Sequence, residues 1–245
     1  MGRSIEVRAA DGHSLSAYLA EPAQAPRGGL VVLQEFFGVN PHIRRMSDVF
    51  AAQGFAALAP ALFDRLEPGI ELAYDGPGMA RGRELRAKLK LDDVLTDVQA
   101  AIGAAAAFGP VAVLGYCWGG SLAYLSATRL SGLACAVGYY GAHIAPYADE
   151  RAKVPVMLHF AETDVYIPLA DVKKIEAAHP GMPIFIYAGT DHGFNCDERE
   201  HYEPKSAALA MQRSLEFISR HLADAAGAAD QTSASFLRRV GNPDF

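Results

Sequence analysis

The chain lacks the features that mark several large classes of protein. Its 245 residues contain three cysteines, an odd number with no C-x-x-C pair, which argues against a disulfide framework and a zinc knuckle. It has no excess of basic residues, because 22 Lys and Arg against 28 Asp and Glu give a net charge of −6. No apolar run approaches the roughly 20 residues that cross a bilayer, and the N-terminus lacks the apolar stretch of an export signal. We therefore expect a cytoplasmic protein that binds neither nucleic acid nor membrane.

What the sequence does contain is an alternation of short apolar runs with longer helical patterns, in a chain that is 51% hydrophobic. This alternation predicts an α/β fold, with a mostly parallel central sheet and helices on both faces. The predicted strands are residues 30–34, 55–59, 111–115, 134–139, 156–160 and 183–187, preceded by a hairpin of residues 4–9 and 15–20. The predicted helices are residues 42–53, 92–108, 119–130, 169–178 and 204–222.

Two segments fall outside this alternation. Residues 62–78 are rich in Pro, Gly and acidic residues, and residues 79–90 after them are basic and helical in pattern. We interpret the two together as an insertion over the edge of the sheet. After Leu222 the composition becomes small and polar, so we expect a single domain over residues 1–222 and a C-terminal tail over residues 223–245. No internal repeat or interdomain linker is visible, and a monomer or weak homodimer is expected.

The sharpest local signal is the run GYCWGG at residues 115–120, between an apolar strand and a helix. It has the form of a nucleophile elbow, in which flanking glycines permit a strained turn that lifts the nucleophile above the sheet. Here the nucleophile would be Cys117, and its place at a helix N-terminus favours the reactive thiolate. The alternative is a buried structural cysteine in a glycine turn. The strand and helix in register favour the nucleophile.

A nucleophile of this kind needs a base and a group that orients the base. Asp164 follows the predicted strand 156–160, and His192 follows the strand that ends at Tyr187. Both therefore leave the carboxyl ends of parallel strands, where open α/β sheets place their ligand sites. The chain order of nucleophile, acid and histidine is that of the α/β-hydrolases. Asp191 and Asp197 are competing acids, but Asp191 is adjacent to His192 in sequence and poorly placed to reach its ring.

The remaining histidines are weaker candidates. His159 lies inside an apolar strand, which indicates a hydrogen-bonded core histidine. His192, Cys196 and His201 could be considered as metal ligands, but there is no fourth ligand and no helical i, i+4 histidine pair. We therefore predict no metal.

A carboxylate stands in an apolar setting directly after the first long strand, in the run QEFFGVN at residues 34–40. Burying Glu35 is costly unless it is paired. Loop amides could satisfy it, or it could point at Cys117. The same segment contributes a backbone N–H at the position where this fold builds its oxyanion hole.

Taken together, these residues resemble the dienelactone hydrolase (carboxymethylenebutenolidase) family of the α/β-hydrolase fold. The resemblance extends over nearly the full chain and rests on residues 34–40, residues 115–120, the run AVGYYG at residues 136–141, and Asp164 and His192. It is the combination that is specific, since any one motif alone is weak.

The resemblance implies a catalytic triad and no cofactor. The triad is Cys117, Asp164 and His192, with Glu35 contacting the resting thiol and assisting its deprotonation. The family's oxyanion donors fall on the backbone N–H groups of Phe36 and Trp118, and Tyr139 is expected to contact substrate.

The sequence departs from the family at the groups that hold the substrate's carboxylate. Family members have a Ser directly after the catalytic histidine and an Arg four residues beyond it, where this chain has Gly193 and Cys196. The family's second substrate-binding Arg falls in the insertion, where Arg81 is the principal match and Arg83 the alternative. Arg199 could replace the missing guanidinium, although its polar surroundings are typical of a solvated residue.

The expected function is a carboxylic-ester hydrolase of the kind used in aromatic degradation. It would open a small enol lactone, similar to dienelactone, through a thioester on Cys117. One alternative is a broad-range small esterase, which a panel of lactones and aryl esters would separate. The other is a non-catalytic binding protein that keeps the pocket, which labelling of Cys117 by iodoacetamide would distinguish.

Overall fold

A single eight-stranded sheet forms the centre of the molecule in the computed structural model, which describes the backbone of residues 2–240 and the side chains of residues 2–228. The strand order is β1-β2-β4-β3-β5-β6-β7-β8. Strand β2 pairs antiparallel with β1 and β4, and every other pairing is parallel. The strands are β1 (Arg3–Arg8), β2 (Ser14–Ala20), β3 (Gly29–Leu33), β4 (Ala56–Pro60), β5 (Val111–Tyr116), β6 (Cys135–Tyr139), β7 (Val156–Ala161) and β8 (Ile184–Tyr187). Each predicted strand is present, with its bounds shifted by no more than one residue.

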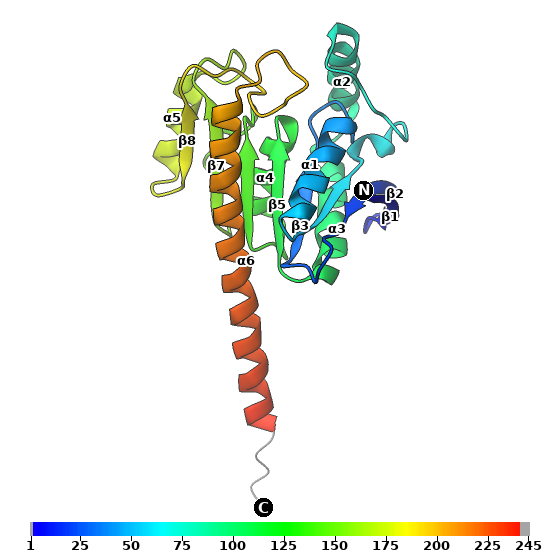
Figure 1. Ribbon diagram of the computed structural model, residues 1–245, viewed down its shortest axis with the longest axis vertical. Coiled ribbons are helices and arrows are strands. Elements are labelled where there is room, and N and C mark those ends of the chain that lie inside the picture. The colour runs from blue at the N-terminus through cyan, green and yellow to red at the C-terminus, as the bar shows by residue number, and fades with distance from the viewer. Residues whose placement is uncertain (1, 241–245) are drawn as a thin grey trace, which may run out of the picture.

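Helices cover the sheet on both faces, as the sequence predicted (Figure 1). Helices α1 and α6 pack on one face, whereas α3 and α4 pack on the other. The helices are α1 (Pro41–Ala52), α2 (Gly76–Lys88), α3 (Leu91–Ala105), α4 (Trp118–Arg129), α5 (Leu169–Ala178) and α6 (Pro204–Val240). The chain is thus an α/β-hydrolase fold, in agreement with the expected class.

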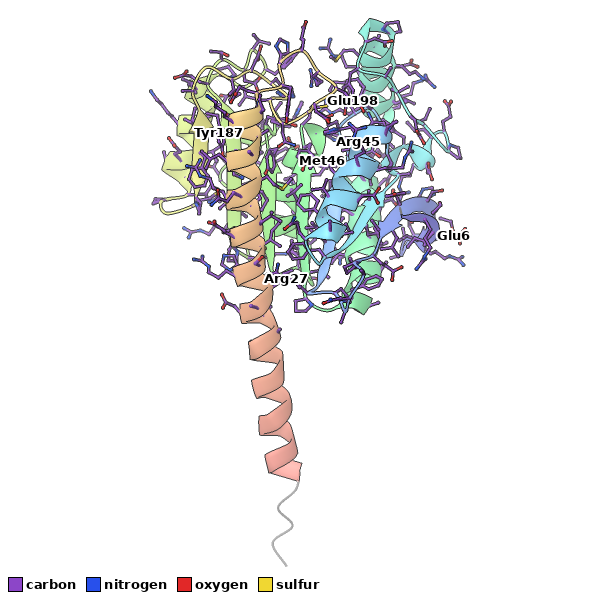
Figure 2. All side chains as sticks on the ribbon, viewed as in Figure 1. Glu6, Arg27, Arg45, Met46, Tyr187 and Glu198 are labelled. Atoms are coloured by element: carbon purple, nitrogen blue, oxygen red, sulfur yellow. The ribbon has the colours of Figure 1, made fainter. Side chains whose placement is uncertain are left out.

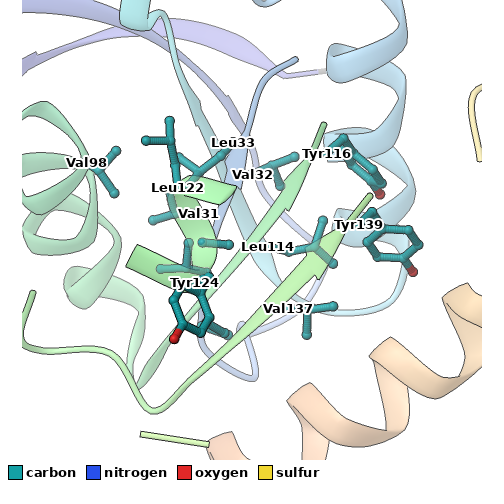
Figure 3. Packing of buried hydrophobic residues seen from close by; sticks show 14 of the residues in the cluster. Val31, Val32, Leu33, Val98, Leu114, Tyr116, Leu122, Tyr124, Val137 and Tyr139 are labelled. Carbon is teal, nitrogen blue, oxygen red and sulfur yellow. The ribbon is translucent and has the colours of Figure 1, made fainter. Parts of the chain in front are cut away.

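The central strands are buried on both faces because helices cover them twice. Every residue of β3 and of β5 is buried, which explains why their sequences run apolar without alternation. Figure 3 shows the packing: Leu114 and Val137 lie side by side on neighbouring strands, and beyond them the rings of Tyr116 and Tyr139 meet with their centroids 4.9 Å apart. This layer forms the floor beneath the carboxyl ends of the strands.

The insertion lies above the carboxyl ends of the strands. It begins with a 3-10 turn at Leu62–Arg65 and ends in α2, which Figure 1 shows beyond the end of the sheet. Asp75 caps α2 by accepting a hydrogen bond from the Gly78 N–H at 2.7 Å. The insertion is therefore positioned to cover a site at that edge.

Helix α6 is longer than the sequence predicted. Its predicted end was Leu222, but the helix continues to Val240 and projects beyond the sheet (Figure 1). The residues that follow Leu222 are rich in alanine, the residue with the highest helix propensity, so the helix has no local reason to stop there. Within the described part of the chain, no helix is both long and apolar enough to cross a membrane.

Candidate active site

Four of the predicted site residues come from loops at the same edge of the sheet. Glu35 follows β3, Cys117 follows β5, Asp164 follows β7 and His192 follows β8. These strands run parallel, so their carboxyl ends meet at one edge. All four side chains are buried. The topology alone therefore gathers the groups that the sequence singled out.

Cys117 sits in a strained turn between β5 and α4. Its φ of 53° and ψ of −114° put a residue with a Cβ in a region that glycine normally occupies. The turn depends on glycine neighbours: a Cβ on Gly115 would lie 2.0 Å from the carbonyl oxygen of Gly119, and one on Gly119 would lie 2.3 Å from that of Leu33. The glycines therefore let α4 start close enough to the sheet to aim Cys117 outward, as a nucleophile elbow requires.

His192 joins Cys117 to Asp164 through hydrogen bonds. Its Nδ1 lies 2.7 Å from Oδ2 of Asp164, and its Nε2 lies 3.1 Å from Sγ of Cys117. Burial works against a charged imidazole, but the Cys117 sulfur and the Asp164 carboxylate outweigh it and raise the pKa of His192 to about 10. The site therefore favours the protonated imidazole, which lies beside the sulfur.

The competing acids and histidines have other partners. Asp191 accepts a hydrogen bond from the backbone N–H of its neighbour His192 and does not reach the ring. His159 is fully buried between the Tyr187 hydroxyl at 2.8 Å and the Ser214 hydroxyl at 3.0 Å. Burial lowers the pKa of His159 to about 3, so it is a neutral core histidine, as the sequence indicated.

Glu35 is fully buried but does not contact the thiol as expected. Its Oε2 accepts a hydrogen bond from the Tyr74 hydroxyl at 2.5 Å, and its Oε1 lies 3.7 Å from Nη1 of Arg199. No hydrogen bond joins Glu35 to Cys117 among the described side chains, because Tyr74 and Arg199 attract the carboxylate while His192 holds the sulfur. Tyr74, in the insertion, escaped the sequence analysis because no local pattern marks it.

A cavity of about 450 Å³ opens beside Cys117, within the size range of small-molecule sites. Phe36 and Trp118 line it. Neither backbone N–H donates a hydrogen bond within the described part of the chain, which leaves both free to bind an oxyanion. The remaining lining residues are Met79, Arg83, Arg86, Ala142, His143, Tyr166, His192 and Arg199.

Of the two arginines expected to bind substrate, the alternative and not the principal candidate lies at the cavity. Arg81, the principal candidate for substrate binding, points away from the cavity and pairs with Glu67 and Glu84 on the surface. The alternative, Arg83, does line the cavity, and its guanidinium reaches the Tyr166 hydroxyl at 3.3 Å.

Helical spacing explains this outcome. Met79, Arg83 and Arg86 stand at i, i+4 and i+7 of α2 and share the face toward the cavity, whereas Arg81 lies on another face. Arg86 was missed by the sequence analysis, and this spacing is the signal that could have found it.

Arg199 is partly buried and not solvated as its polar sequence suggested. Its side chain is 11% exposed and lies over the Tyr74 ring, 5.8 Å from the centroid. Gly193 creates the space, because a Cβ there would lie 2.7 Å from Nη1 of Arg199. The departure from the family at Gly193 therefore makes room for a guanidinium that enters from a different position in the loop.

Tyr139 does not line the cavity. It is fully buried in β6, and its hydroxyl lies 2.7 Å from the Ser214 hydroxyl. The next residue, Tyr140, packs its ring against His192 with the centroids 5.0 Å apart. Tyr139 thus supports the floor of the site, and the contact with substrate expected for it does not follow from its position.

One group of side chains among the described residues has the spacing of metal ligands: His42, Cys196 and Asp197, with ligand atoms within 4.8 Å of one another. It offers three ligands, fewer than a closed structural zinc site. Asp197 is already paired with Arg45, whose other nitrogen contacts Glu198, labelled beside it in Figure 2. Burial raises the pKa of the Cys196 thiol to about 12. A guanidinium on the carboxylate and a protonated thiol both disfavour a bound cation.

Comparisons with known proteins identify the family of this chain. Residues 15–222 match the dienelactone hydrolase family. A carboxymethylenebutenolidase of Pseudomonas putida is 32% identical over 228 residues, covering 88% of this chain and 95% of that protein. A carboxymethylenebutenolidase of Pseudomonas sp. strain P51 is 34% identical over 226 residues, covering 88% of this chain and 94% of that protein.

Solved structures share the fold. A crystal structure from Klebsiella pneumoniae, described as "Putative Dienelactone Hydrolase", aligns with a TM-score of 0.80 and 28% identity, covering 89% of this chain and 98% of the other. An esterase of Pyrococcus furiosus aligns with a TM-score of 0.66 at 13% identity, covering 91% and 93% of the two chains, which shows a common fold.

Proposed function

Because the chain belongs to the dienelactone hydrolase family and is a hydrolase, we propose that it opens a small enol lactone or related activated ester through a covalent thioester on Cys117. The observation that carries the proposal is the continuous Cys117–His192–Asp164 hydrogen-bond chain at the edge of the cavity. Every role that acyl transfer needs has a residue there: nucleophile, base, orienting acid and two backbone donors.

The first half of the reaction forms the thioester. The Cys117 thiolate attacks the carbonyl carbon, and the backbone N–H groups of Phe36 and Trp118 stabilise the oxyanion. The carbon–oxygen bond of the lactone then breaks, and the enolate leaves. The His192 imidazolium is placed to give it a proton. A thiolate suits such a substrate, since a good leaving group needs no strong base in the free enzyme.

The second half releases the acid. Neutral His192, oriented by Asp164, takes a proton from water, and the resulting hydroxide attacks the thioester carbonyl. The carbon–sulfur bond breaks and the thiolate is restored. No step needs a cofactor or metal. Because the nucleophile must stay reduced, we place the protein in the reducing cytoplasm.

Glu35 has a positioning role in this proposal. Its carboxylate is held by Tyr74 and Arg199 away from the sulfur. It partly compensates the buried charge of Arg199 and keeps that guanidinium at the wall of the cavity. A substrate that drew Arg199 toward itself would free Glu35 to turn toward Cys117.

A broad-range esterase remains the second candidate function. The cavity is larger than a minimal lactone needs and adjoins a second cavity of about 180 Å³. A panel of lactones and simple aryl esters, compared by kcat/KM, separates the two functions. A preference for lactones supports the first, and equal turnover of the esters supports the second.

The decisive experiment traps the acyl-enzyme. Wild-type protein is quenched in acid during turnover of an aryl ester, and mass spectrometry should find the acyl group on the peptide containing Cys117. Replacing the nucleophile by Cys117→Ala should lower kcat by more than about 10³-fold, because deleting a nucleophile removes the covalent path. Cys117→Ser should be far weaker than wild type, since the site is arranged for a thiolate.

Cys135→Ala is the matched control. Burial in β6 raises the pKa of the Cys135 thiol to about 12, so this cysteine is inert and its variant should remain active. An acyl group found elsewhere, or a Cys117→Ala protein with substantial activity, would refute the triad.

A further inference from the structure

A second cavity opens beside the catalytic one and shares a wall with it. This side cavity has a volume of about 180 Å³, and Arg86, Trp118 and His143 line both cavities. Trp118 directly follows the nucleophile in the chain and is 7% exposed. Its ring stacks on Phe63 with the centroids 5.6 Å apart. The shared wall therefore begins next to Cys117, and packing holds its aromatic part in place.

The inside of the side cavity is apolar. It lies between α4, the junction of α2 with α3, and the loop after β6. On α4, Trp118, Leu122 and Leu125 stand at i, i+4 and i+7 and share one face. In the described part of the chain, no residue that lines the side cavity alone is charged, and most are aliphatic: Leu89, Leu91, Val94, Leu122, Leu125 and Pro146. The Ser121 hydroxyl there already accepts a hydrogen bond from the His143 backbone N–H at 2.9 Å. An apolar chain that entered this space would remove apolar surface from water, which is favourable.

The direction of acyl transfer decides which part of a substrate can reach the side cavity. His192 lines the catalytic cavity but not the side cavity. Its imidazolium protonates the leaving oxygen, which must therefore lie within hydrogen-bond reach of Nε2. Tyr166 lines the catalytic cavity beside His192, with the ring centroids 5.1 Å apart. The leaving group thus points to this wall. The acyl group, bonded to Cys117, extends along Trp118 toward the side cavity.

We propose that the side cavity binds an apolar acyl chain of the substrate and selects it by length. This inference rests on the proposed function and specifies its substrate class: esters or lactones whose acyl part carries an unbranched apolar chain. A volume of about 180 Å³ holds about six groups of the size of a water molecule, at roughly 30 Å³ each, and a methylene group is of similar size. The chain that fits is therefore about six carbon atoms long.

Two esters with the same leaving group test the site. 4-Nitrophenyl hexanoate has a chain long enough to enter the side cavity, whereas the acyl group of 4-nitrophenyl acetate ends in the catalytic cavity. The measured quantity is the ratio of their kcat/KM values. In the wild-type protein the hexanoate should exceed the acetate by about 10- to 100-fold, because each buried methylene contributes about a factor of four.

Two substitutions of Leu91, which lines the side cavity but not the catalytic one, change this space. Leu91→Trp fills it and Leu91→Glu puts a carboxylate beside the chain, so each should lower the ratio about 10-fold or more. Leu91 is the first residue of α3, where a carboxylate favours the helix, and Leu91→Glu should therefore fold. A ratio that stayed unchanged in both variants would overturn the proposal.

Leu169→Glu is the matched control, since Leu169 is likewise the first residue of a helix, α5, and lines neither cavity. Its ratio should equal that of wild type. A second pair of esters, phenyl acetate and 4-butylphenyl acetate, carries the chain on the leaving group instead. If Leu91→Trp changed the ratio of this pair and left that of the first pair unaltered, the side cavity would bind the leaving group and the acyl assignment would be wrong.

A binding measurement separates this proposal from the proposed hydrolysis. Hexanamide has the same chain but no good leaving group, and it should protect Cys117 of the wild-type protein from iodoacetamide at about 10-fold lower concentration than acetamide does. This advantage should disappear in Leu91→Trp and persist in Leu169→Glu. If neither 4-nitrophenyl ester is turned over but hexanamide still protects better, the hydrolysis proposal fails and the side cavity stands as a site for apolar chains. Equal protection by hexanamide and acetamide in wild type refutes the site, whatever the turnover.

Discussion

Two buried histidines, His159 and His192, show how neighbouring groups decide the pKa of an imidazole. His159 is surrounded by hydroxyl groups and has its pKa lowered to about 3, whereas His192 lies between a sulfur and a carboxylate and has its pKa raised to about 10. Both side chains are almost completely buried. Desolvation is therefore common to the two, and the charged partners make the difference.

The first prediction follows from this contrast. In a 15N-histidine NMR titration, His192 should keep its proton through neutral pH and lose it near pH 10. Asp164→Asn should move that midpoint downward, because it removes one of the groups that favour the charged ring while burial still opposes it. His159 is an internal control and should stay neutral from pH 5 to 10. A midpoint near the ordinary value of about 6.5 in wild type would contradict the charged pair.

The raised pKa of His192 also makes the free energy of unfolding depend on pH. His192 binds its proton more tightly in the folded chain, so its contribution to the free energy of unfolding is complete below the unfolded pKa of about 6.5. That contribution declines as pH rises and is lost above the folded pKa of about 10. Alkaline pH, not acid, is where this group ceases to stabilise the fold.

At the scale of elements, the elbow depends on how closely α4 approaches β3. A Cβ on Gly119 would lie 2.3 Å from the Leu33 carbonyl oxygen and 2.6 Å from that of Gln34. These are backbone atoms of the strand that leads to Glu35 and Phe36, and they cannot move without moving the site. The turn therefore fixes the position of Cys117 relative to the backbone of Glu35 and Phe36.

We therefore expect Gly119→Ala to displace the start of α4 and to lower kcat/KM by about 10²-fold, since a shift near 1 Å at a reacting group has that effect. Overpacking should also cost about 1–3 kcal/mol of stability, measured by urea unfolding. Gly103→Ala in α3 is the control: its added Cβ meets nothing within 4 Å, and alanine favours the helix. Full activity in Gly119→Ala would show that the close approach is dispensable.

The elements also show what the sequence could predict and what it could not. The strands and the turn at Cys117 were predictable because local patterns of apolar runs and glycines encode them. That Asp164 and His192 lie at the same sheet edge as Cys117 was predictable because both follow strands of the parallel sheet. The partners of Glu35 were not, since Tyr74 and Arg199 come from loops whose paths depend on packing. The choice between Arg81 and its neighbours was predictable in principle from helical spacing on α2.

At the scale of the whole molecule, the division at Leu222 can be judged from burial along α6. Phe217, Ile218 and Leu222 are buried against the rest of the domain, and Leu222 approaches Gly28 at the start of β3. From residue 223 to residue 228 no side chain is buried. The helix continues past this point, but residues 223–228, the last whose side chains the structure describes, add no buried side chain to the core.

The last prediction is that removing residues 223–245 leaves the enzyme intact. The deletion takes away no buried side chain among residues 223–228, so the melting temperature should fall by less than about 2 °C and kcat/KM should be unchanged. Deleting residues 217–245 is the matched control. It also removes Phe217, Ile218 and Leu222, each worth about 2–5 kcal/mol, and should prevent folding. Light scattering on the full-length chain and on the chain that ends at Leu222 should give the expected monomer or weak homodimer for each. Activity should survive because the active-site cavity lies at the carboxyl end of the sheet and α6 projects from the other end. A shorter chain that folds but loses activity would contradict this and place part of the functional unit beyond Leu222.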